Sequence, residues 1–92
     1  MSAIDSQTLM SQIVRTLEDK KAINIVTLDL HGISLVADYF VICHGNTDRQ
    51  VKALADTVIE QVEKAGYRLY GVEGLDAARW VLIDAGDVVI HI

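Results

Sequence analysis

Apolar residues recur at helical spacing in two segments of the chain. The first segment, residues 2–21, carries one apolar face made of Leu9, Met10, Ile13 and Leu17, which predicts a helix. Ser2, with Asp5 three residues later, resembles a capping box at the start of that helix. Residues 24–30 then alternate between apolar and polar and predict a strand.

The second helical segment has the clearest boundary signals. Thr47 and Gln50 have the spacing of a capping box, and Gly66 stands where a left-handed residue ends a helix. Between them runs an apolar stripe made of Val51, Leu54, Ala55, Val58, Ile59 and Val62. Asp56 lies beside this stripe and is expected to be a half-exposed acid that pairs locally, for instance with Lys52.

The remaining apolar runs predict further strands. Residues 39–43 form a continuous apolar run, which is typical of a strand buried on both faces in a central or parallel position. Residues 67–73 follow the second helix, so residues 39–73 read as a βαβ-like unit. Since the chain closes on an antiparallel hairpin, we expect a mixed sheet with helices packed on at least one face.

The closing hairpin, residues 80–92, turns at Ala85 and Gly86. A two-residue loop would pair Asp84 with Asp87, whereas a bulged turn with Gly86 left-handed would shift the pairing by one residue and exchange the faces. We favour the first register because it separates a purely β-branched face from a mixed one. The β-branched face is Val81, Ile83, Val88, Ile90 and Ile92. In either register Trp80, Leu82 and Asp84 share the other face.

Composition narrows the class of protein. The 92 residues, of which 51% are hydrophobic, suffice for one domain with one core. A net charge of −5 disfavours nucleic-acid binding, which needs clustered Lys and Arg, and suits a basic protein partner. The single cysteine, Cys43, precludes an internal disulfide, and neither a signal peptide nor a membrane span is visible. We therefore expect a cytoplasmic protein.

The sequence contains few of the residue patterns that an enzyme active site would need. A strand followed by Gly45 and a helix N-terminus can bind an anion, so nucleotidyl transfer is the reaction class to consider. That chemistry needs paired metal-binding carboxylates, and the chain has no Asp-x-Asp or Asp-x-Glu sequence. Asp84 and Asp87 flank a turn three residues apart, and we assign them to stabilising it.

The candidate nucleophile and metal ligands are equally scattered. His31, His44 and His91 have no ligand spacing to one another or to Cys43. Cys43 lies inside an apolar strand run and is expected to be a small buried hydrophobe, with His44 on the opposite strand face. The residues predict no catalytic site, no cofactor and no metal.

Trp80 is the strongest candidate for binding. It is the only tryptophan, and it shares a strand face with Leu82 and Asp84, the composition of a docking patch with an aromatic anchor. The alternative is a Trp80 covered by the first helix, by a loop or by a segment beyond Ile92. The chain also ends in mid-strand, which is typical of a fragment whose tail covers the sheet or of an association surface.

Several motifs together resemble the ribosomal silencing factor family, also called RsfS or Iojap. The resemblance covers roughly residues 24–92, with the first helix also in place. The matching pieces are Asp38-Tyr39-Phe40-Val41-Ile42-Cys43, Gly45-Asn46, Asp48-Arg49-Gln50-Val51, Ala55-Asp56, Gly71-Val72-Glu73-Gly74, Trp80-Val81-Leu82-Ile83-Asp84, Gly86-Asp87-Val88 and His91. Each piece is weak alone, and their combination is specific.

The resemblance implies an α/β (α+β) domain with a mixed sheet of about five strands, related to the nucleotidyltransferase fold but without transferase activity. It implies a partner, ribosomal protein L-fourteen of the large ribosomal subunit. Occupying that site would block joining of the small subunit and repress translation under nutrient limitation. Relatives usually continue past the last strand into a C-terminal helical segment, so residues 1–92 are expected to be the single silencing-factor domain without that segment.

The resemblance also gives the docking patch a purpose. We expect the ribosomal-protein patch to comprise Tyr70, Glu73, Trp80, Leu82, Asp84 and Asp87. Its acids would meet basic side chains of the partner, with Trp80 as the buried anchor. Two alternatives stay open: a nucleotidyltransferase-like enzyme that binds nucleotide, and a plain homodimerisation module that uses the open hairpin edge.

Overall fold

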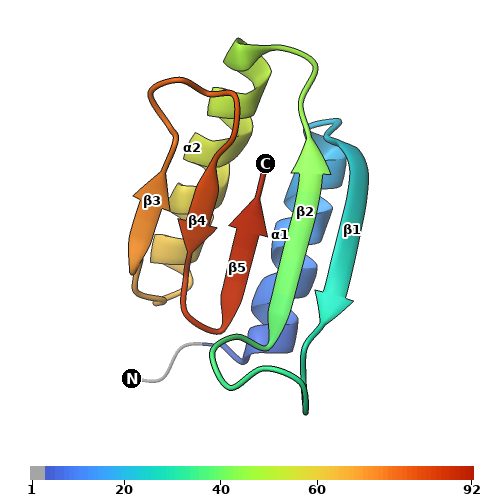
Figure 1. The fold of residues 1–92 in the computed structure, drawn as a ribbon, viewed down its shortest axis with the longest axis vertical. Helices are drawn as coiled ribbons and strands as arrows, with labels where there is room; N and C mark the ends of the chain where they lie inside the picture. The colour runs from blue at the N-terminus through green and yellow to red at the C-terminus, as the bar shows by residue number, and fades with distance from the viewer. Residues whose placement is uncertain (1–3) are drawn as a thin grey trace.

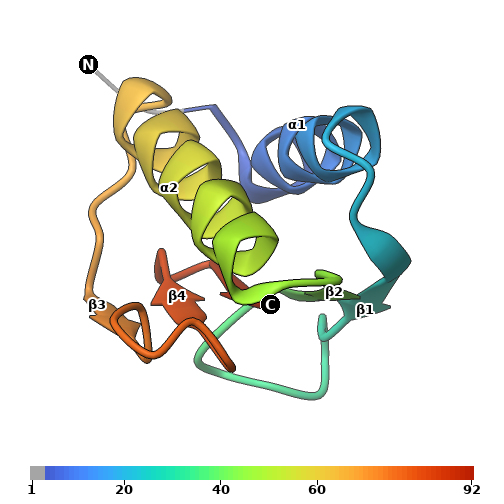
Figure 2. The ribbon, with the colours of Figure 1, turned by 90° about the horizontal axis from the view of Figure 1, so that it is seen from above.

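The computed structural model describes residues 4–92, which form two helices and five strands. In chain order these are α1 (Ser6–Asp19), β1 (Ile23–Asp29), β2 (Tyr39–His44), α2 (Asp48–Lys64), β3 (Gly71–Glu73), β4 (Leu82–Asp84) and β5 (Val88–His91). Figure 1 views the sheet face-on with both helices behind it, and Figure 2 shows the helices together on one side. The described residues therefore form two layers, and none of their helices lies over the second face of the sheet.

Helix α1 begins later than the sequence predicts. Its N-cap is Asp5, whose carboxylate accepts a hydrogen bond of 2.7 Å from the backbone N–H of Thr8. The capping box predicted at Ser2 involves a residue outside the described part of the chain. Asp5 therefore acts as the cap itself rather than as the third residue of the helix.

Helix α2 has the caps that the sequence predicts. The hydroxyl of Thr47 accepts a hydrogen bond of 3.1 Å from the backbone N–H of Gln50, and Gly66 ends the helix at φ +85°. The predicted Lys52–Asp56 pair is absent among the described residues, and Lys64 instead pairs with Glu60 at 2.9 Å. An acid four residues before a lysine is the better orientation along a helix, which accounts for the difference.

The Thr47 cap supports a stability prediction. Thr47→Ala removes the acceptor for one orphan N–H and should lower the free energy of unfolding by about 1 kcal/mol. The matched control is Thr57→Ala, because the Thr57 hydroxyl only donates to the Ala53 carbonyl within the helix, at 2.9 Å. Urea unfolding of both variants checks this, and equal midpoints would contradict the assigned role of Thr47.

The sheet has the order β1-β2-β5-β4-β3, with β2 and β5 parallel and all other neighbours antiparallel. The mixed sheet is therefore confirmed, and β2 and β3 run in the same direction with two strands between them. The predicted strand over residues 67–73 shortens to Gly71–Glu73. The backbone N–H of Tyr67 instead donates to the Val62 carbonyl of α2 at 3.1 Å, so Tyr67 does not pair in the sheet. Its hydroxyl donates to the Ile4 carbonyl, just before α1, at 2.6 Å.

The core lies between the helices and the sheet face that they cover. Along β2, Tyr39, Val41 and Cys43 are buried, whereas Phe40 is 39% exposed. The prediction that this strand is buried on both faces is wrong, because helices cover only one face. Its predicted central position, parallel to a neighbour, is confirmed by β5.

The closing hairpin adopts neither predicted register. Asp84 pairs with Val89, and the Ala85 N–H donates to the Val88 carbonyl, so the two-residue loop is Gly86-Asp87. Gly86 has φ +84°, as the first loop residue of a II′ turn requires. The shift of two residues from the favoured register keeps the paired side chains of β4 and β5 on their predicted faces, whereas Asp87 moves into the loop. The β-branched face is buried in the core.

Candidate functional site: the open face of the sheet

The sheet face without helices, here called the open face, consists of two rows of side chains. The strand registers place them side by side: Glu73, Leu82, His91, Ile42 and Val26 in one row, and Gly71, Asp84, Val89, Phe40 and Leu28 in the other. The β3–β4 side carries two acids and the β1–β2 side is apolar. None of these ten residues is Lys or Arg.

Trp80 lies at one end of the open face, just before β4. Its side chain is 49% exposed, and its ring meets His91 edge-on with centroids 5.2 Å apart. A cavity of about 250 Å³ adjoins it, lined also by Ile42, His44 and Arg79. The structure therefore presents Trp80 half-open beside a hollow, and the alternative in which α1 covers it is excluded by the position of α1 on the other face.

The structure brings together four of the six predicted patch residues. Leu82 and Asp84 of β4 lie beside β3, where Glu73 pairs with Leu82. Trp80 is two residues before Leu82 and so follows the same alternation of faces along the chain. Asp84 also accepts a hydrogen bond of 2.8 Å from the Gly86 N–H, which confirms the predicted turn role of its side chain.

The other two patch residues, Tyr70 and Asp87, lie at the turn end of the sheet. A Cβ built on Gly86 would come within 2.8 Å of the Tyr70 ring, so this ring packs against the Gly86-Asp87 loop. Asp87 is the exposed second residue of that loop. Both residues border the open face rather than standing in its rows.

Sequence reasoning missed the apolar half of the site. Val26, Leu28 and Phe40 are 47%, 42% and 39% exposed on the open face. The alternation of residues 24–30 predicted a strand, but it carried no information on which face would lack a cover. A usable signal was the charge pattern, since residues 22–48 contain no Lys or Arg.

The structure gives Cys43 the environment of an inert thiol. Its side chain is 1% exposed, and burial raises its pKa to about 11, so the thiol stays protonated at neutral pH. His44 is exposed on the opposite side of β2. Within residues 4–92, no group of three or more His, Cys, Asp or Glu side chains is arranged to hold a metal ion.

An exposed polar cluster lies at the base of the β1–β2 loop. His31 Nδ1 is 2.7 Å from an Asp29 oxygen, and His31 Nε2 is 3.5 Å from an Asp38 oxygen. Asp38 also accepts a hydrogen bond of 2.7 Å from the Ser6 hydroxyl of α1. Hydrogen bonding to Asp29 raises the pKa of His31, and the backbone N–H and ring of His31 lower the pKa of Asp29.

These shifts predict a pH window for the contact. A raised His31 pKa favours the contact below its ordinary value of 6.5 and weakens it as pH rises through the folded-state pKa. A lowered Asp29 pKa favours the contact above pH 3.8, and the contact weakens as pH falls through the folded-state pKa of Asp29. An NMR titration should find the His31 midpoint above 6.5 in the intact protein, returning toward 6.5 in Asp29→Asn. A midpoint below 6.5 in the intact protein would refute this assignment.

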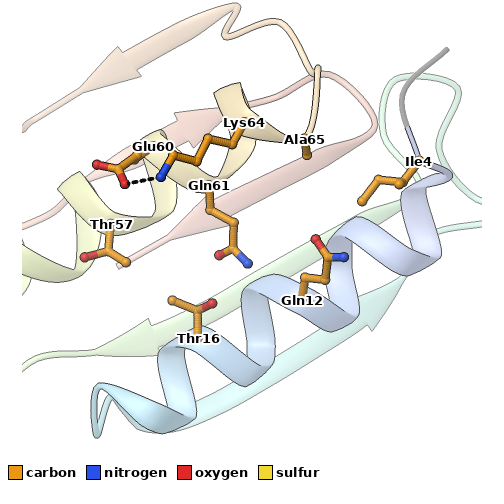
Figure 3. Close-up of a pocket in the computed structure, with 8 residues that line it drawn as sticks. All are labelled: Ile4, Gln12, Thr16, Thr57, Glu60, Gln61, Lys64 and Ala65. Carbon is orange, nitrogen blue, oxygen red and sulfur yellow. Dashed lines mark hydrogen bonds and ion pairs between the residues drawn. The ribbon is translucent and has the colours of Figure 1, made fainter. Parts of the chain in front are cut away.

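The helical side carries a second hollow, a groove of about 520 Å³ between α1 and α2. Figure 3 shows Gln12 and Thr16 of α1 pointing toward Thr57 and Gln61 of α2, with the Glu60–Lys64 pair above them. The Gln61 Oε1 atom is buried there without a hydrogen-bond partner among the described residues. The groove offers neutral amides and hydroxyls and lies on the opposite side of the molecule from Trp80.

No helix within residues 4–92 is long and apolar enough to cross a membrane.

Comparison with known proteins supports the resemblance seen in the motifs. The model of a family described as "Ribosomal silencing factor during starvation" matches residues 3–92. The ribosomal silencing factor RsfS of Bacillus subtilis is 55% identical over 75 residues, which are 82% of this chain and 64% of that protein.

Two solved structures have the same fold. A crystal structure from Bacillus halodurans has a TM-score of 0.85 at 45% identity, covering 94% of this chain and 80% of that one. Another from Chromobacterium violaceum has a TM-score of 0.89 at 36% identity, covering 96% and 73%. The chain thus spans about two thirds to four fifths of these relatives.

Proposed function

The chain belongs to the ribosomal silencing factor family, and we propose that it binds the large ribosomal subunit through the open face and blocks joining of the small subunit. We infer that the contact is made with ribosomal protein L-fourteen and that the effect is steric, without catalysis by this chain. Translation would be repressed when nutrients are scarce, and the protein would act in the cytoplasm.

One observation carries this proposal: within residues 4–92 no helix covers one face of the sheet, which has an aromatic side chain at its end and acids on one side. A sheet in a two-layer domain commonly has one face in water, but that face is then usually polar. Exposed apolar side chains gathered on such a face mark an interaction surface. The proposed patch is Trp80, Leu82, Asp84 and Glu73, bordered by Tyr70 and Asp87.

Charge indicates the chemistry of the partner. The chain carries −5, and the rows of the open face contain acids but no Lys or Arg. Proteins that bind ribosomal RNA are basic, because phosphate neutralisation requires Lys and Arg. A ribosomal protein therefore complements this face in charge, and the attraction should weaken as salt screens it.

The direct test is binding of the purified chain to isolated L-fourteen and to cognate large subunits at two salt concentrations. We expect binding to both, weaker at the higher salt. Binding to neither at low salt would overturn the proposed function, and binding to the large subunit alone would overturn the choice of L-fourteen.

A further inference from the structure

The loop between β1 and β2 exposes three large apolar side chains within four residues. Ile33, Leu35 and Val36 are 80%, 106% and 80% exposed, more than any other large apolar side chain among the described residues. Figure 1 shows the loop projecting beyond the strands at the end of the sheet where β1 stops and β2 begins. Burying one such side chain in a partner would contribute substantially to binding.

The loop is held in one shape by its own polar groups. The Leu30 carbonyl accepts hydrogen bonds from the N–H groups of Ile33 and Ser34, at 3.0 and 2.9 Å. The Ser34 hydroxyl accepts from the Val36 N–H at 3.0 Å, and the Leu30 N–H donates to the Asp38 carbonyl at 2.8 Å. These bonds present the apolar side chains outward before any partner arrives, which lowers the entropic cost of binding.

The loop segment carries acids and a histidine but no Lys or Arg. Residues 22–48 contain no Lys or Arg, and Asp29 and Asp38 stand at the base of the loop around His31. A complementary surface is therefore an apolar hollow with a basic border. An anionic membrane would instead repel this border, which disfavours lipid as the occupant.

The loop also adjoins the apolar half of the open face. Leu28 and Phe40 are cross-strand neighbours on that face, one residue from the loop end of β1 and β2 respectively. The apolar surface thus continues from the loop onto the face that carries Trp80 at its other end.

We propose that Ile33, Leu35 and Val36, with Leu28 and Phe40, form a second anchor that enters an apolar hollow with a Lys and Arg border on the large ribosomal subunit. The inference rests on the proposed function, because it assigns both anchors to the same bound state. Trp80 and the loop would then hold the partner at two ends of one surface, so that loss of either anchor weakens the complex.

The test compares two opposite charges at one exposed site. Val36→Lys and Val36→Glu both remove an apolar side chain, but Lys also faces the basic border. We expect Leu35→Ser to weaken large-subunit binding at least about tenfold and Val36→Lys to weaken it more than Val36→Glu. The matched control, Ala53→Ser on the exposed side of α2, should bind as the unchanged chain does.

Each outcome separates this inference from the proposed function. If Trp80→Ala loses binding while Leu35→Ser and both Val36 variants keep it, the second anchor is wrong and the proposed function stands. If the unchanged chain does not bind large subunits at all, the proposed function fails, and the second anchor fails with it.

Two further measurements test whether the loop binds a membrane or a second copy of the chain instead. Flotation with phosphatidylglycerol vesicles that is lost in Leu35→Ser would assign the loop to a membrane. Sedimentation equilibrium showing a dimer that Leu35→Ser dissociates, with ribosome binding intact, would assign it to a second copy of the chain. Either result overturns the second anchor. Unchanged melting temperatures of the variants are the folding control.

Discussion

Replacing Trp80 with alanine should cost the chain at least about 2 kcal/mol of its affinity for the large subunit, a loss of about thirtyfold. Trp80 is 49% exposed, contacts His91 edge-on and lines a hollow, so it is accessible to a partner and is not part of the core. Equilibrium binding of the purified variant to large subunits measures the effect. Trp80→Phe should retain part of the affinity, because an aromatic ring remains.

Tyr70 provides the comparison within the same surface. It is a more exposed aromatic residue, at 63%, but it lies at the border against the Gly86 turn. Tyr70→Ala should therefore weaken binding less than about fivefold, as contacts at the rim of an interface generally do. Equal losses for Trp80→Ala and Tyr70→Ala would contradict the placement of the anchor at Trp80.

The largest effect on stability should come from Gly74→Ala. Gly74 has φ +80°, and a Cβ built there would lie 1.8 Å from the Trp80 carbonyl oxygen and 3.0 Å from its ring. The added methyl group meets backbone that cannot yield cheaply and adds left-handed strain, so unfolding should become easier by about 2–5 kcal/mol. Denaturant unfolding measures this directly.

Gly71 offers a matched control three residues earlier. A Cβ at Gly71 would meet nothing within 4 Å, and its φ does not lie in the left-handed region. Gly71→Ala should therefore leave the unfolding midpoint nearly unchanged. If Gly74→Ala were as stable as Gly71→Ala, the close approach between Gly74 and the Trp80 backbone would be wrong, and so would the account of how Trp80 is positioned.

Local features of the fold were readable from the sequence because they depend on neighbouring residues. The Thr47 cap, the Gly66 helix end and the alternating faces of the closing hairpin each depend on residues only a few positions apart. The hairpin register escaped prediction, since Gly86 can serve several turn types and only packing of the whole sheet selects one.

The candidate site depended on contacts that the sequence does not encode locally. Strand β5 enters between β2 and β4, which places Phe40 beside Val89 and in one row with Asp84, although Phe40 is distant from both in the chain. The sequence pattern of β2 also gave no sign that both helices would pack on the same face of the sheet. Glu73, Trp80, Leu82 and Asp84 could be predicted together because they are close in sequence. The apolar half of the site was missed because its residues are far from these four in the chain.

The central claim is that occupation of the open face keeps the two ribosomal subunits apart. A sucrose gradient of purified large and small subunits, mixed with and without the chain, tests it most directly. We expect the chain to migrate with the large subunit and the peak of joined ribosomes to fall, with Trp80→Ala restoring that peak. Joined ribosomes that form undiminished while the chain is bound to the large subunit would contradict the claim.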